Sequence, residues 1–206
     1  MPAGLVAAIL FLAGVVAANG LFRYAWRTHT PRPKISYLGE LLVGSLWAGV
    51  WLNQPAINVG ILLAFFLVST VLVLVIITDF FWQEISTSVL MPVIVIIGVL
   101  AMSNLTDLPD RWSALTGSLV AAGFFLWQYV LSRGRWVQIG DVWIGVLAGL
   151  LVGWNQITLV AAVAYAGATV YALLCAIIKH QQRFDRVPLG SFLAWSTLIF
   201  FLATLI

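Results

Sequence analysis

Long runs of apolar residues, separated by short connections, are the feature of this sequence that most restricts its fold. Each run covers about 15 to 22 residues, and at the helical rise such lengths cross or nearly cross roughly 30 Å of hydrocarbon. Strands would leave backbone groups without partners in lipid, so we expect helices. The chain is 63% hydrophobic and 8% charged, unlike a water-soluble domain. The sequence therefore predicts an all-α, polytopic membrane protein.

The apolar runs are expected to form about eight transmembrane helices. They cover about residues 3–22, 37–52, 58–78, 87–102, 113–132, 141–154, 156–178 and 189–206. Because the connections are short, we expect one integral-membrane domain over residues 1–206.

Positive charge gathers in alternate connections between these runs. With the N-terminus outside, nine of the ten Lys and Arg residues lie inside, and only Arg111 lies outside. This bias predicts a multi-pass protein of the cytoplasmic membrane with its N-terminus outside. Arginines follow the first run rather than precede it, which favours a retained helix over a cleaved signal peptide. The net charge of +3 follows from this topology and leaves no basic patch for nucleic acid.

Two aspartates stand at the ends of apolar runs in a chain with seven acidic residues. Asp79 closes the third run, and Asp141 opens the sixth, so the topology places both near the cytoplasmic face. Two close carboxyl groups do not both ionise easily, so one keeps a proton while the other polarises a water. This pattern predicts an aspartic-protease dyad.

Helix capping is the alternative explanation of these two aspartates. Asp141 would be stabilised at the positive N-terminus of its helix. Asp79 fits this explanation poorly, because it lies at a C-terminal end, where negative charge is unfavourable, although an arginine on the inner side would be a suitable partner.

Other polar and small residues add weaker signals. Glu40 lies about one turn into the second run, where a carboxylate is costly, and it is expected to shape a substrate entrance or to pair with Lys34. Gly145, Gly149 and Gly153 recur on one helix face and favour close helix packing. With one cysteine and two isolated histidines, His29 and His180, we expect no metal site.

The residues around the aspartates resemble those of a known family. After Asp79 comes a short loop and then a helix with Pro92. Gly140 precedes Asp141, and Pro188-Leu189-Gly190 opens the last run, with Phe192-Leu193-Ala194 after it. In this order and spacing, they resemble the type IV prepilin peptidases, membrane aspartic proteases of the Gly-x-Gly-Asp kind. Ile35-Ser36-Tyr37 before Glu40 also resembles the start of that family's second helix.

The resemblance implies an endopeptidase that removes the short leader of type IV pilin-like precursors at the cytoplasmic face. Asp79 and Asp141 would be the catalytic pair, with Gly140, Glu40, Pro188 and Gly190 in supporting roles. The partners would be the prepilin or pseudopilin precursor and the lipid bilayer, and the products would serve pilus assembly or secretion.

Several positions depart from the family pattern. Gln138 replaces the first glycine of Gly-x-Gly-Asp, Ser86 replaces a proline, and Trp143 replaces a lysine. The first inner loop, about residues 23–36, is short and has no cysteine, whereas bifunctional members carry a zinc-binding insertion there. We therefore expect neither zinc nor S-adenosylmethionine as a cofactor, and N-methylation stays open.

Three other functions are compatible with two membrane carboxylates. A presenilin or signal-peptide-peptidase type of intramembrane protease also uses a Gly-Asp motif, but Thr78 stands where those chains have a tyrosine. A small proton-coupled transporter relays protons through acids, although the sequence has no internal repeat typical of many transporters. A non-catalytic family member acting as a scaffold is suggested by Gln138, Ser86 and Trp143.

Overall fold

The computed structural model describes residues 3–25, 36–54, 58–103, 109–179 and 187–205, and every regular element in these ranges is an α-helix. The elements are α1 (Ala3–Ala25), α2 (Ser36–Asn53), α3 (Val59–Trp82), α4 (Thr87–Ser103), α5 (Arg111–Ser132), α6 (Ile139–Lys179) and α7 (Leu189–Leu205). The all-α prediction is confirmed for the described part of the chain.

The predicted number of eight helices is wrong, because the described residues form seven. The sixth and seventh predicted runs belong to one element, α6, with no connecting loop between them. Gly153 interrupts its helical geometry, with φ 72° and ψ −178°. A side chain at this φ would be strained, whereas glycine adopts it readily. The break is therefore made by a single residue instead of a turn.

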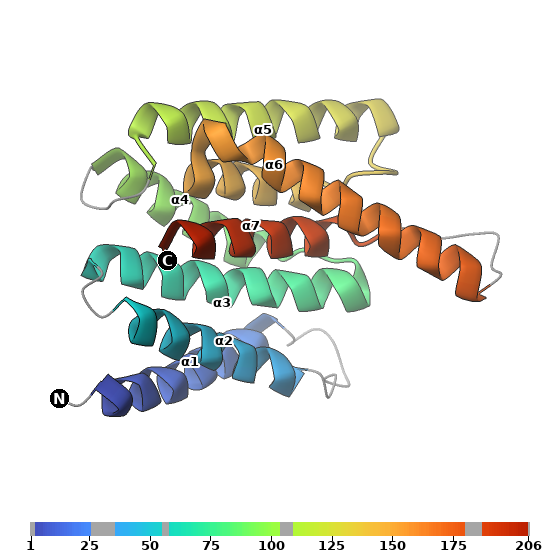
Figure 1. Ribbon diagram of the computed structural model, residues 1–206. Helices are drawn as coiled ribbons and strands as arrows, with labels where there is room; N and C mark the ends of the chain where they lie inside the picture. Colours follow the sequence, from blue (N-terminus) through green and yellow to red (C-terminus); the bar gives the residue numbers. More distant parts are fainter. Residues whose placement is uncertain (1–2, 26–35, 55–57, 104–108, 180–186, 206) are drawn as a thin grey trace.

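The chain folds back at Gly153. Gly145, on the first arm of α6, packs against the ring of Phe125, and Tyr165, on the second arm, stacks on the same ring at a centroid distance of 6.4 Å. In a straight helix these two residues would be about 30 Å apart. The two arms of α6 therefore run side by side with α5, as Figure 1 also shows.

Four helices, α1, α3, α5 and α6, are long and apolar enough to cross a membrane, and α4 and α7 are shorter apolar helices. Exposed large apolar side chains occur along the bundle, for example Val16, Val99 and Leu119, as expected for surfaces that face lipid. The protein is thus a multi-pass membrane protein.

Helix α3 forms the centre of the bundle. It packs against α7, α2, α1 and α4, and α6 packs between α5 and α7. Most of the α3 side chains are buried, so this helix has little surface for lipid. The glycines of α6 serve the contact with α5: Gly149 lies against the Gly117 backbone. This placement favours close helix packing as the role of Gly145, Gly149 and Gly153.

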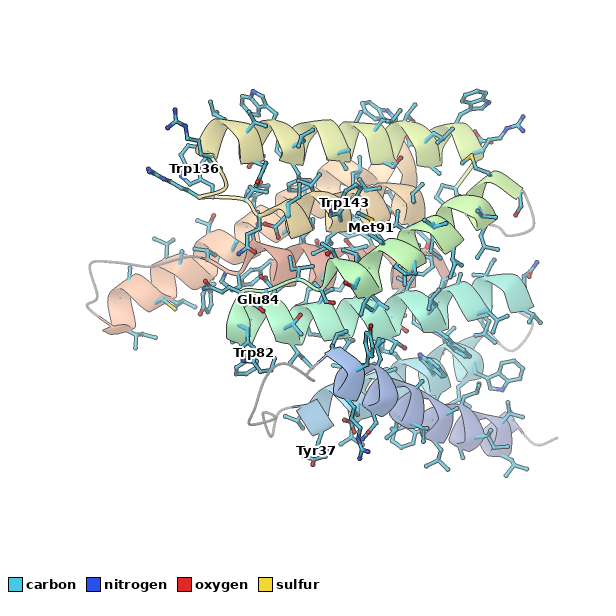
Figure 2. All side chains as sticks on the ribbon, turned by 180° about the vertical axis from the view of Figure 1, so that it is seen from behind. Tyr37, Trp82, Glu84, Met91, Trp136 and Trp143 are labelled. Atoms are coloured by element: carbon cyan, nitrogen blue, oxygen red, sulfur yellow. The ribbon has the colours of Figure 1, made fainter. Side chains whose placement is uncertain are left out.

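Several helices begin or end at the same end of the bundle. Helices α3 and α5 end there, and α6 and α7 begin there, at the right in Figure 1. Trp82, Glu84 and Trp136 lie at this same end in the reverse view of Figure 2.

Both histidines and the basic residues Arg27, Arg32, Lys34, Arg183 and Arg186 lie outside the described residues.

Candidate active site

Asp79 and Asp141 come together at Gly190, the second residue of α7. A Cβ atom placed on Gly190 would lie 2.8 Å from Asp141 Oδ1 and 3.0 Å from Asp79 Oδ2. The two oxygens are therefore no farther apart than the sum of these distances. That separation is on the scale of one bridging water, which hydrogen-bonds at about 2.8 Å on each side. Both residues are buried, with exposed fractions of 2% and 3%.

Asp79 is held by the first turn of α7. The backbone N–H of Ser191 donates to Asp79 Oδ2 at 2.6 Å, and Ser191 Oγ lies 3.0 Å from the same oxygen. Free N–H groups and the positive end of the helix dipole make such a position favourable for a carboxylate. The unfavourable C-terminal position of Asp79 in α3 is thus offset by the N-terminus of another helix.

Asp141 is held by the first turn of its own helix. The backbone N–H of Gln138 donates to Asp141 Oδ2 at 2.7 Å, and Gln138 directly precedes α6. This is one half of a capping box, in which a side chain reaches back to the residue before the helix. The second oxygen, Oδ1, is buried and has no hydrogen-bond partner among the described residues.

Capping therefore explains one oxygen of each carboxylate but not the pair. A cap requires one acceptor, and nothing in capping requires two carboxylates to point at the same glycine. A buried polar atom without a partner is rare and costs about 1–3 kcal/mol. The unpartnered Oδ1 of Asp141, which lies beside Gly190 as Asp79 Oδ2 does, is the feature that a purely structural role leaves unexplained.

Ile85 lies against Gly140 and Gly190 and leaves no room for a side chain at either position. A Cβ atom on Gly140 would lie 2.6 Å from Ile85 Cβ, and one on Gly190 would lie 2.8 Å from Ile85 Cδ1. Ile85 belongs to the connection between α3 and α4. Both glycines therefore give Ile85 room beside Gly190, the residue at which the two carboxylates meet.

Two further predicted residues, Pro188 and Glu40, are buried near the ends of α7 and α2. Pro188 is buried just before α7, consistent with helix initiation, and the chain reaches Gly190 two residues later. Glu40 is 4% exposed and accepts a hydrogen bond from Asn19 Nδ2 at 3.0 Å. This bond joins α1 to α2. The expected partner of Glu40, Lys34, lies outside the described residues.

Aromatic side chains run beside the carboxylates. Phe80 contacts Phe81 at a centroid distance of 5.6 Å and Tyr171 at 5.7 Å, and Tyr171 contacts Phe192 at 5.8 Å. Phe80 follows Asp79 and Phe192 follows Ser191, so the row ties α3, α6 and α7 together. Phe80 and Phe81 are nearly half exposed.

The structure describes the surroundings of the three residues that depart from the Gly-x-Gly-Asp peptidase pattern, Trp143, Gln138 and Ser86. Trp143 packs against the hydrophobic core on the first arm of α6 (Figure 2). Gln138 supplies the N–H for Asp141, a contact that any residue except proline offers. Ser86 C=O accepts bonds from Val89 and Leu90 N–H groups at the start of α4.

No group of three or more His, Cys, Asp and Glu side chains suitable for a metal occurs in the described part of the chain. Cys175 is a free, half-buried thiol.

Ser191 was not identified from the sequence. It is separated from Asp79 by 112 residues, and no local pattern indicates this contact. The only available signal is a small polar residue directly after Gly190.

Comparisons with protein-family models, curated proteins and solved structures gave no match.

Proposed function

We propose that this protein is a membrane-embedded aspartic endopeptidase that uses Asp79 and Asp141. The observation that carries the proposal is the meeting of two buried carboxylates at Gly190, with Asp141 Oδ1 left without a partner. A water between the two groups would satisfy that oxygen. The same water would be the nucleophile.

The chemistry follows the logic of carboxylate pairs. One carboxylate accepts a proton from the water as the water attacks the peptide carbonyl, and the other, protonated carboxyl donates to the carbonyl oxygen. The carboxyl that took the proton from water then donates it to the leaving nitrogen as the C–N bond breaks, and the other carboxylate takes a proton from a hydroxyl of the tetrahedral intermediate, so the pair again holds one proton. The chain supplies two buried carboxyl groups, and together with one water they suffice for peptide hydrolysis.

The substrate class comes from the resemblance to the type IV prepilin peptidases. A precursor with a short basic leader and a following apolar helix would lie with that helix in the bilayer and its leader at the membrane surface. We propose that the carboxylates lie near the cytoplasmic face of the cytoplasmic membrane, with the N-terminus outside. The arginines at the ends of α1 and α5, Arg23, Arg133 and Arg135, support this orientation through the positive-inside rule.

A peptide reaches the pair only when the site opens, because both aspartates are almost fully buried. We propose that the connection between α3 and α4 moves, since its Ile85 lies beside Gly190, where the two carboxylates meet. Catalytic sites that open for substrate commonly use a connection of this kind.

A structural, non-catalytic pair is the competing role, and the two caps favour it. Asp79 caps α7 and Asp141 caps α6. In that role the protein would cleave no precursor, and replacing an aspartate by asparagine would change only stability.

Cleavage of a defined precursor tests the proposal. The purified protein in liposomes is incubated with a prepilin-type precursor, and the product termini are mapped by mass spectrometry. The proposal expects one cut between the basic leader and the apolar helix. The proposal is contradicted if every precursor of this kind that the host encodes remains intact at all incubation times.

A further inference from the structure

Ser191 holds a position that the catalytic proposal alone does not use. Its hydroxyl oxygen lies 3.0 Å from Asp79 Oδ2 and 3.0 Å from the backbone carbonyl oxygen of Ile76. Both acceptors belong to α3, whereas Ser191 belongs to α7. Ser191 is 2% exposed, so bulk solvent does not compete for either contact.

A hydroxyl group carries one proton and two lone pairs. The Ser191 hydroxyl therefore donates fully to only one of these two acceptors at a time. When Asp79 is ionised, the charged oxygen is the stronger acceptor, and the hydroxyl proton points to Asp79 Oδ2. When Asp79 carries a proton on Oδ2, that oxygen becomes a donor, and the same hydroxyl accepts from it while donating to Ile76 C=O.

We infer that Ser191 is a positioning residue whose hydroxyl turns between Asp79 and Ile76 as the proton of the pair moves. The inference rests on the proposed function, because a carboxylate pair that hydrolyses peptides passes through both protonation states of each member. Rotation about one bond keeps Asp79 hydrogen-bonded in either state. Ser191 thus limits the cost of moving the proton within a buried site.

The backbone N–H of Ser191 has a different task. It donates to Asp79 Oδ2 and cannot accept, so it favours only the ionised form of that carboxyl. Removing the hydroxyl while keeping the N–H would therefore leave Asp79 in place and deprive it of the partner that serves both states.

The chain offers a matched control for this experiment. Ser196 also lies on α7, is also 2% exposed, and donates to the Leu193 carbonyl of its own helix. Ser196→Ala removes an equally buried hydroxyl without touching either carboxylate. Ser191→Thr keeps a hydroxyl at the position of interest.

Cleavage kinetics provide the first test. For Ser191→Ala we expect kcat to fall about ten- to a hundredfold, the range for losing one hydrogen bond to a charged group, with KM unchanged. Ser191→Thr should restore most of kcat, and Ser196→Ala should stay within about twofold of the wild type. An unchanged kcat in Ser191→Ala, or a loss expressed in KM, overturns the inference.

Infrared spectroscopy provides a test that does not need activity. With ¹³C-labelled aspartate, the wild-type minus Asp79→Asn difference spectrum isolates the bands of Asp79 at low and high pH. Ser191→Ala should shift both the protonated and the ionised band, and Ser196→Ala should shift neither. A shift in only one of the two bands overturns the inference, and this result does not depend on whether the protein cleaves a precursor. Shifts in both bands without precursor cleavage support the hydroxyl switch and refute the proposed function.

Discussion

The backbone N–H of Ser191 donates a 2.6 Å hydrogen bond to Asp79 Oδ2, so a carboxylate from the last turn of α3 caps the first turn of α7. The N-terminus of α7 therefore performs two tasks. It orients Asp79, and it carries Gly190, beside which an oxygen of Asp79 and an oxygen of Asp141 both lie. Both carboxylates lie at helix N-termini, where their charge is least costly.

Gly190→Ala should abolish most activity. The added methyl group would lie within 3.0 Å of an oxygen of each aspartate and 2.8 Å from Ile85 Cδ1, so all three side chains would have to move. Displacing catalytic groups by a fraction of an ångström to 1 Å commonly costs about a hundredfold in rate. Cleavage assays measure this loss. Gly98→Ala on α4, where the nearest atom is 3.9 Å away, is the control and should retain wild-type activity.

Gly153→Ala should destabilise the fold. The φ of 72° is unfavourable for alanine, and the new methyl group would meet Ser113 Oγ at 2.5 Å. We expect a loss of about 1–3 kcal/mol in the free energy of unfolding, seen as a lower midpoint of thermal unfolding in detergent. Gly123→Ala, which has no atom within 4 Å of its new methyl group, should leave the midpoint unchanged or raise it. Equal midpoints for the two variants would refute this account of the break.

Glu40→Gln should keep cleavage within about threefold of the wild type. Glutamine still offers an oxygen to Asn19 Nδ2, which in the wild type donates to Glu40, so the hydrogen bond between α1 and α2 is kept. Glu40→Ala removes the acceptor and should cost about 1–3 kcal/mol of stability. Thermal unfolding and cleavage, measured on both variants, separate the two effects. A hundredfold loss of cleavage in a stable Glu40→Gln protein would instead assign Glu40 to the catalytic machinery.

Much of this architecture was predictable from the apolar runs, for a physical reason. A bilayer restricts helix length, so runs such as residues 58–78 indicate where α3 crosses and that Asp79 lies at its end. The alternation of direction between successive runs also predicts that Asp79 and Asp141 lie near the same end of the bundle. These predictions rest on local hydropathy alone.

Other features depend on contacts that hydropathy does not report. The boundary between the predicted runs 141–154 and 156–178 lies close to the break at Gly153, but hydropathy does not report whether the chain breaks there at one residue or through a loop. The Ser191–Asp79 contact joins positions 112 residues apart, and a serine at the start of a helix is common for reasons unrelated to catalysis. Ile85 likewise looks like an ordinary apolar residue until Gly140 and Gly190 meet it.

Precursor cleavage by Asp79→Asn and Asp141→Asn, measured side by side in liposomes, tests the central claim most directly. Asparagine keeps an oxygen for the Ser191 or Gln138 N–H group, so both variants should fold, but neither supplies the acid and base chemistry. We expect each variant to lose at least about a thousandfold in cleavage rate. Asp110→Asn, at the cap of α5, should cleave at the wild-type rate. Wild-type cleavage rates in folded Asp79→Asn or Asp141→Asn would contradict the account.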